Sequence, residues 1–205
     1  MQILARQFSP RRAQALLLAV ALGLSLGAST SARSKDQRPF SNIKIDNFGQ
    51  MDERFFRGAQ PQERDYKALA DLGIKTIIDL RDDPTSYERH DAEALGMRYV
   101  NIPMSDKHYP SDAQIEQFLK LVSDPATGKF YVHCAGGRHR TGVMGAVYRY
   151  NFYNWNYDQA YREMKDFDFY TRWGHGAMKD YVRDYYQRIK SGQIHALASV
   201  SAAIR

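Results

Sequence analysis

Residues 133–141 constrain this chain more than any other segment. They read His-Cys-Ala-Gly-Gly-Arg-His-Arg-Thr and place Cys134, the only cysteine, ahead of Arg140 with five residues between them. A hydrophobic run at 129–132 precedes the string, and small and apolar residues at 142–147 follow it. This order predicts a strand, a tight loop and a helix. Because the N–H groups of such a loop and of the first helical turn converge, the loop should bind an anion the size of phosphate.

The two reactive side chains of this loop suit attack on phosphorus. A field that attracts phosphate also lowers the pKa of a nearby thiol, so Cys134 should be held as thiolate. The planar guanidinium of Arg140 can hold two phosphate oxygens at once. The alternative is an inert buried cysteine in a glycine-rich turn, since unpaired cysteine is often buried.

The pattern H-C-x-x-G-x-x-R-T resembles the signature of the cysteine-dependent protein tyrosine and dual-specificity phosphatase superfamily. It looks closest to the compact atypical dual-specificity group, of a bacterial exported type, and the resemblance runs loosely from Phe55 to Met164. Ala135 stands where a lysine is common, which weakens the case for a phosphoinositide substrate. The side chains of Arg138 and His139 are expected at the rim of the loop, where they could select substrates.

The resemblance implies roles for the loop residues. Cys134 would be the nucleophile, Arg140 would hold the phosphoryl group, and Thr141 would donate a hydrogen bond to the sulfur. His133 is expected to orient the loop through buried hydrogen bonds. The substrate-binding residues implied by the loop are His133, Ala135, Gly136, Gly137, Arg138 and His139.

The same resemblance implies an aspartic acid about 30 residues before the cysteine, which protonates the leaving oxygen and later activates water. Asp106 lies 28 residues before Cys134 and is the first acidic residue after a predicted strand that ends at Ile102. Residues 105–111 also resemble the T-D-H-x-W-P-T loop of bacterial phosphatase-like inositol phosphatases. Asp112 is the alternative, but it falls in the first turn of a helix, where an acid is expected for capping alone.

Other polar side chains receive no catalytic role. A structural or solvated position is expected for Arg57 and Arg81, although Arg81 could reach a second phosphate. The segment 173–176 breaks the helical pattern, and its position does not follow from the sequence. No metal or other cofactor is expected, because no second cysteine exists and three histidines show no metal-ligand spacing: His90, His175 and His195.

Strand-like and helix-like segments alternate along the chain. The predicted strands are 55–58, 75–80, 97–102 and 130–133. The helices predicted with both bounds are 63–72, 86–95 and 140–152. Three further helices are predicted from local signals: a capping box at Ser111 and Gln114, a start at Asn156 with Gln159, and an apolar stripe from Met178 to Ile189. Alternation predicts one α/β domain over residues 40–192, with a mostly parallel central sheet flanked by helices on both faces. Ligands bind at the carboxyl ends of such strands, so the loops after Ile102 and His133 should meet there.

The N-terminal 32 residues have the pattern of a secretory signal. Arginines precede an apolar stretch that is short for a membrane span, and small residues end at Ala32. Residues 193–205 are expected to form a flexible tail. We therefore predict export to the periplasm or beyond, with an uncleaved N-terminal anchor as the alternative.

Removal of residues 1–32 would take three arginines and no acidic residue, lowering the formal net charge from +6 to +3. No basic stripe interleaved with aromatics remains, so nucleic acid is not an expected partner. The mature protein is expected to be a monomer without stable membrane association.

These observations favour a phosphomonoester hydrolase that acts through a phosphocysteine. The expected partner is a phosphorylated protein or a small phosphate ester, and the short chain favours dual-specificity breadth. The alternatives are an inositol (poly)phosphate phosphatase using the same site, a non-catalytic phosphate-ester binding module, and sulfur or redox transfer by the lone thiol.

Overall fold

The computed structural model describes residue 40 and residues 42–194. The predicted signal at 1–32 and most of the predicted tail at 193–205 lie outside the described residues. Among those described, no helix is both long enough and apolar enough to cross a bilayer.

Five strands form one sheet in the order β1-β2-β5-β3-β4. Their bounds are β1 Gly49–Gln50, β2 Phe55–Gly58, β3 Ile74–Arg81, β4 Arg98–Met104 and β5 Lys129–His133. The four longer strands pair in parallel, and β1 pairs with β2 antiparallel. The predicted mostly parallel sheet is therefore confirmed. Strand β1 does not follow from the sequence, because a Gly-Gln pair carries no strand pattern.

Six α-helices accompany the sheet in the described part of the chain. Their bounds are α1 Tyr66–Asp71, α2 Glu88–Ala94, α3 Asp112–Ser123, α4 Arg140–Tyr153, α5 Tyr157–Asp166 and α6 Gly176–Lys190, with short 3-10 turns η1 at Glu63–Asp65 and η2 at Pro125–Thr127. The helix predicted at 63–72 is thus a 3-10 turn followed by a short α-helix. Both capping boxes are present, at Ser111 with Gln114 and at Asn156 with Gln159.

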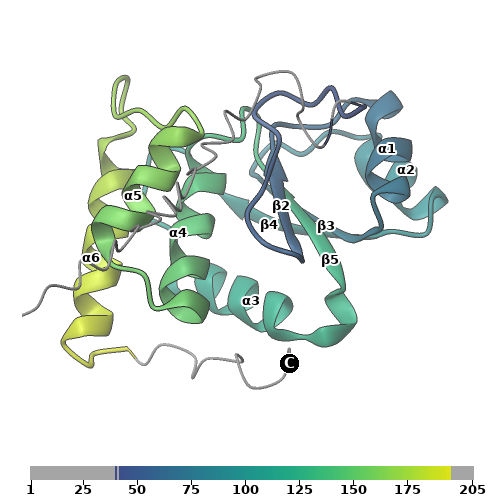
Figure 1. The fold of residues 1–205 in the computed structure, drawn as a ribbon. Coiled ribbons are helices and arrows are strands. Elements are labelled where there is room, and N and C mark those ends of the chain that lie inside the picture. Colours follow the sequence, from purple (N-terminus) through teal and green to yellow (C-terminus); the bar gives the residue numbers. More distant parts are fainter. Residues whose placement is uncertain (1–39, 41, 195–205) are drawn as a thin grey trace, which may run out of the picture. The chain divides into compact units, whose positions relative to one another are not determined.

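Helices cover both faces of the sheet, as predicted. Figure 1 shows α1 and α2 on one side and α3 to α6 on the other. Alternate residues of a strand point to opposite faces: in β5, Phe130 and Val132 join the core under α3 to α6, whereas Tyr131 joins the core under α1 and α2. The apolar helix predicted at 140–152 is α4, which is buried along nearly its whole length.

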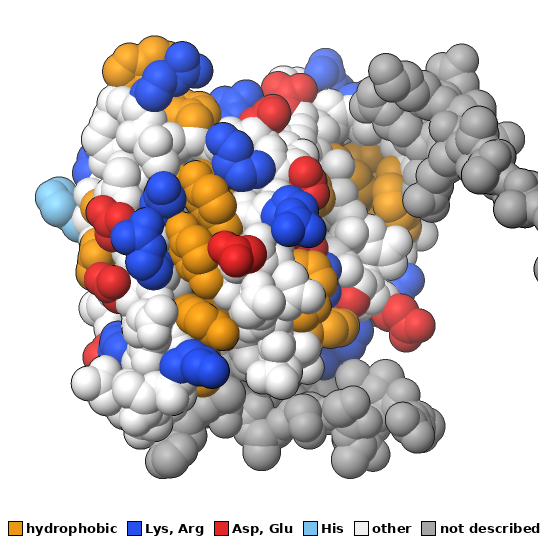
Figure 2. Space-filling view, turned by 60° about the vertical axis from the view of Figure 1, so that its left-hand side comes forward, with side chains coloured by type: hydrophobic (Ala, Val, Ile, Leu, Met, Phe, Trp, Pro, Cys, Tyr) orange, Lys and Arg blue, Asp and Glu red, His pale blue; other side chains and the backbone are white. Residues whose placement is uncertain are grey.

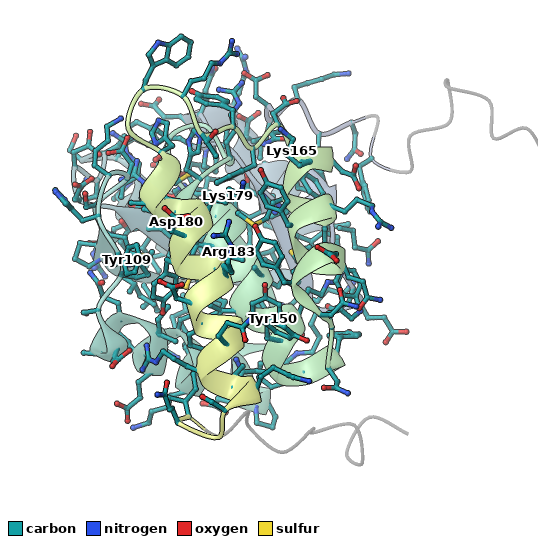
Figure 3. All side chains as sticks on the ribbon, turned by 90° about the vertical axis from the view of Figure 1, so that its left-hand side faces the viewer. Tyr109, Tyr150, Lys165, Lys179, Asp180 and Arg183 are labelled. Atoms are coloured by element: carbon teal, nitrogen blue, oxygen red, sulfur yellow. The ribbon has the colours of Figure 1, made fainter. Side chains whose placement is uncertain are left out.

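The outer surface of α5 and α6 combines aromatic and charged side chains. Figure 2 shows hydrophobic side chains flanked by Lys and Arg side chains on this side, and Figure 3 shows Lys179 and Arg183 along α6. The Arg183 guanidinium lies 5.6 Å from the centre of the Tyr157 ring, and the Lys179 amine 5.3 Å from that of Tyr161. These cation–π contacts join the two helices.

Candidate active site

The signature loop joins the end of β5 to the start of α4, at the carboxyl edge of the sheet. Its carbonyl groups are held from outside the loop. The Gln60 N–H donates to the Ala135 carbonyl at 3.2 Å, and the Asn47 amide donates to the carbonyls of Gly136 and Gly137 at 3.4 and 3.0 Å. No acceptor in the described part of the chain bonds the N–H groups of residues 135–139. Those donors are available to an anion.

A buried arginine lies behind the loop. Arg57 of β2 is 1% exposed and donates to the Gly137 carbonyl at 2.6 Å, and its guanidinium stacks 4.1 Å from the centre of the Phe167 ring. Burial lowers the pKa of Arg57 to about 10, an effect that Glu163 and then Cys134 oppose. Arg57 is therefore a charged group at neutral pH, and its role here is structural.

Gly137 is required by this close packing. Its φ is +65°, and a Cβ at this position would lie 2.4 Å from the backbone carbon of Gly58. A side chain would therefore force the loop away from β2, and with it the carbonyl that Arg57 and Asn47 hold.

Cys134 is 3% exposed and sits among groups that stabilise its charged form. Burial by itself raises the pKa of the thiol, but the Thr141 side chain and the Arg140 guanidinium outweigh burial and bring that pKa below the ordinary 9.0. The Thr141 hydroxyl is buried, and its interaction with the thiol is among the causes that lower this pKa. Its position next to the sulfur is the one that the resemblance implies.

Arg140 is held at one end by residues of neighbouring loops. One terminal nitrogen donates to Asp82 at 2.7 Å and to the Met104 carbonyl at 3.1 Å, whereas Nε is buried and has no partner in the part of the chain that the structure describes. The Arg140 guanidinium is thus held in place, and its Nε–H remains as a donor for an oxyanion. Asp82 is not among the site residues that the sequence predicts. Its position directly after β3, at the same carboxyl edge, was the signal that could have identified it.

His133 is fully buried beside two carboxyl groups. Its Nε2 lies 2.8 Å from Glu88 Oε1, and its Nδ1 lies 3.9 Å from Asp79 Oδ1. The contact between His133 Nε2 and Glu88 Oε1 is a buried ion pair when the imidazole is protonated. Burial lowers the pKa of His133, but Glu88 and then Asp79 outweigh burial, and the pKa lies above 6.5. His133 therefore anchors the loop to a buried carboxylate.

The donor atoms of Asp79, Glu88 and His133 lie within 4.8 Å of one another, close enough to hold a cation. Three of the four carboxylate oxygens already accept hydrogen bonds, however. Asp79 Oδ1 accepts from the Arg81 N–H at 2.8 Å, Asp79 Oδ2 from the Tyr99 hydroxyl at 2.8 Å, and Glu88 Oε2 from the Gln60 amide at 2.9 Å. The fourth, Glu88 Oε1, faces the His133 ring. We interpret the cluster as a buried charge network that supports the loop.

The two rim residues differ from each other. Arg138 is at the rim, with a side chain 42% exposed, and it borders a hollow of about 510 Å³. The remaining lining residues of this hollow are Lys165, Asp168, Phe169, Tyr170 and Trp173. The predicted rim position of the His139 side chain is wrong, because the residue is 8% exposed and packs under the segment that follows α5.

Asp106 follows β4 at the same edge as the signature loop. Its carboxylate is 40% exposed, and the Lys107 amine lies 3.6 Å away. Burial lowers the pKa of His139 to about 4 and His175 adds to this effect, while the nearby charge of Asp106 opposes it. The proposed acid thus lies near the signature loop. Asp112, the alternative, is in the first turn of α3 and pairs with Arg188 at 2.9 Å.

Arg81 and the connector 173–176 both lie next to the loops of the site. Arg81 donates to Asp83 at 2.9 Å and to the Gln60 side chain at 3.1 Å, so it supports the loops beside the site. The connector 173–176 contacts the loop that carries Asp106, since the Lys107 amine donates to the Trp173 carbonyl at 2.9 Å.

The sequence model of one protein family, described as DSP-PTPase phosphatase fused to NAD+ kinase, matches residues 39–179. The chain belongs to this DSP-PTPase family. The probable chloroplastic NAD kinase 2 of Oryza sativa subsp. japonica is 33% identical over 112 residues, which make up 51% of this chain and 11% of that protein. The chain therefore spans about a tenth of that relative's length.

Two smaller phosphatases match a larger share of the DSP-PTPase chain. The dual specificity protein phosphatase TpbA of Pseudomonas aeruginosa is 26% identical over 155 residues, covering 74% of this chain and 65% of that protein, and its crystal structure has a TM-score of 0.59. The catalytic core of the PP-IP phosphatase SIW14 of S. cerevisiae is 18% identical, with a TM-score of 0.60 over 74% of this chain and 95% of that one. The resemblance to the phosphatase superfamily is confirmed. The SIW14 catalytic core has the same fold as this chain.

Replacing Thr141 should raise the pKa of the Cys134 thiol. In Thr141→Ala, the pH midpoint of iodoacetamide alkylation should move upward by about one to two units, since a hydrogen bond to a charged group contributes about 1.5–3 kcal/mol. Thr141→Ser keeps the hydroxyl and should titrate like the wild-type protein. A midpoint unchanged in Thr141→Ala would exclude this hydrogen bond.

Proposed function

We propose that this DSP-PTPase protein hydrolyses phosphomonoesters through a phosphocysteine intermediate. The observation that carries the proposal is the position of Cys134. Its thiol has a lowered pKa and lies at the start of a loop whose carbonyls are held away from the anion position. Such a loop supplies N–H donors to the equatorial oxygens of a transferring phosphoryl group, usually the largest contribution to catalysis of this kind.

The reaction has two steps. The Cys134 thiolate attacks phosphorus, the P–O bond to the leaving group breaks, and Asp106 gives its proton to the departing oxygen. The Asp106 carboxylate then takes a proton from water, which attacks phosphorus and breaks the P–S bond. Thr141 stabilises the departing thiolate in this second step, and Arg140 with the loop N–H groups holds the phosphoryl oxygens throughout.

Phosphotyrosine and other phosphorylated side chains are the proposed substrates. The similarity to a dual specificity protein phosphatase supports this reading. Inositol diphosphates are the second candidate. The similarity to a protein named an inositol diphosphatase favours them, as do the cationic side chains of Arg138 and Lys165 beside the hollow at the loop.

Substitution of the nucleophile tests the proposed chemistry. Cys134→Ser should abolish steady-state release of phosphate from a phosphotyrosine peptide, a phosphoserine peptide and inositol hexakisphosphate, while phosphate esters still bind. The preferred ester of the wild-type protein, assayed with reductant and EDTA, would identify its substrate class. Binding without turnover by the wild-type protein would instead support a non-catalytic binding module. Undiminished turnover by Cys134→Ser would contradict the covalent step.

Substitution of the acid tests the protonation step. Asp106→Asn should lose turnover mainly toward esters with poor leaving groups, by about 100-fold or more, because general acid catalysis contributes about 10²–10⁴. The measurement is kcat/KM across aryl phosphates from 4-nitrophenyl phosphate to phenyl phosphate, because kcat/KM reports the first step and excludes the later role of Asp106 as base. Asp112→Asn is the matched control and should retain the wild-type dependence on leaving group. An equal loss across the series would reassign the acid.

We also propose that the protein is exported, in agreement with the signal pattern of residues 1–32. A lone low-pKa thiol outside the cytoplasm would be open to oxidation, so activity should then require reductant. Sequencing the N-terminus of the protein recovered from a bacterial periplasm should give a chain that begins near residue 33. An intact N-terminus in the membrane fraction would favour the uncleaved anchor, and an intact N-terminus in the cytoplasm would contradict export.

A further inference from the structure

The connector between α5 and α6 packs directly on the loop that carries Asp106. The His175 ring nitrogen Nδ1 lies 2.9 Å from the Asp106 carbonyl, and the Lys107 amine donates to the Trp173 carbonyl at 2.9 Å. Gly174 has a φ of +89°, and a Cβ there would lie 3.2 Å from Cδ of Lys107. The absence of a side chain at Gly174 therefore permits the close approach.

His175 also contacts the signature loop. Its imidazole stacks on that of His139, with ring centres 3.6 Å apart and planes 11° from parallel, and both side chains are buried. His139 Nε2 lies 3.0 Å from the Tyr170 carbonyl, which identifies this nitrogen as the protonated one. A single residue thus contacts both the loop that binds the anion and the loop that carries the acid.

The contacts of His175 also assign its tautomer. Because a carbonyl can only accept, Nδ1 must carry the proton that bonds the Asp106 carbonyl. Nε2 then faces the Lys107 amine at 3.4 Å as an acceptor. Burial lowers the pKa of His139 to about 4, so the His139 ring is neutral near pH 7 and the stacked pair carries no like-charge repulsion.

The far side of the acid loop is held by α6 itself. The Tyr109 hydroxyl donates to Asp184 at 2.8 Å, and the Tyr109 and Tyr181 rings meet at 5.3 Å between centres. Figure 3 shows Tyr109 beside α6. The backbone is thus fixed on both sides of Asp106. The Asp106 carboxylate itself is 40% exposed and has Lys107, at 3.6 Å, as its ionic partner.

We propose that His175 is a positioning residue for the acid: its bond to the Asp106 carbonyl and its stacking on His139 set the distance between the Asp106 carboxyl and a phosphoryl group in the signature loop. The inference rests on the proposed role of Asp106 as general acid. A general acid must lie within about 2.6–3.2 Å of the oxygen that it protonates, and a shift of about 1 Å can cost about 100-fold in rate.

Two substitutions separate the contributions of the ring and of the donor. His175→Phe keeps an aromatic ring to stack on His139 but removes the donor to the Asp106 carbonyl. His175→Asn can keep a donor near Nδ1 without the stacked ring. His175→Phe should lower kcat/KM for phenyl phosphate by about 10- to 100-fold and change kcat/KM for 4-nitrophenyl phosphate by less than about threefold. His175→Asn should recover part of the phenyl phosphate rate.

A structural defect would produce a different pattern. In His175→Phe the pH midpoint of Cys134 alkylation should stay at the wild-type value, and the double variant with Asp106→Asn should lose no more than Asp106→Asn alone. Arg183→Gln, on the outer face of α6 in Figure 3, should behave as wild type on both esters. An equal loss on both esters, or no loss on either, would overturn the role of His175.

The same measurements separate the inference from the proposed function. If Asp106→Asn discriminates between the esters and His175→Phe does not, the inference alone is wrong. If Asp106→Asn does not discriminate, the acid is wrongly assigned and the inference falls with it. If Cys134→Ser retains turnover, the covalent mechanism is wrong.

Discussion

The outward anchoring of the signature-loop carbonyls is the interaction on which the rest of the site depends. A loop that presents its N–H groups to an anion leaves its carbonyls to be satisfied elsewhere, and buried carbonyls without partners are costly. Here Asn47, Arg57 and Gln60 supply those partners. All three come from the segment around β1 and β2. This explains why a two-residue antiparallel strand at the edge of the sheet matters to a site built at its centre.

The buried charges around this loop follow from the same arrangement. Arg57 lies behind the loop, and its buried cation interacts favourably with a thiolate at Cys134. The pair of His133 and Glu88 is close to neutral as a unit, so it anchors the loop without adding a second uncompensated cation. Breaking such a buried pair leaves a lone charge and typically costs about 3–5 kcal/mol. The network therefore ties the geometry of the loop to the stability of the fold.

The features that the sequence predicts correctly are those formed by residues close together in the chain. The strand, loop and helix around Cys134 are contiguous, and the capping box at Ser111 uses residues three apart, so both were predicted. The contacts that were missed join distant segments. Asp82 reaches Arg140 across 58 positions. The sequence predicts the His139 side chain at the rim, yet the connector after α5 covers it with the imidazole of His175.

That connector lies outside the nine signature residues, although the family match over residues 39–179 includes it. In the proposed mechanism the signature loop fixes how the phosphoryl group is held, whereas the position of the proposed acid, Asp106, depends on the loop after β4 and on the segment at 170–176 that packs against it. These two requirements are carried by different parts of the chain. Leaving-group preference can therefore change through the connector while the nine signature residues and the covalent chemistry stay the same.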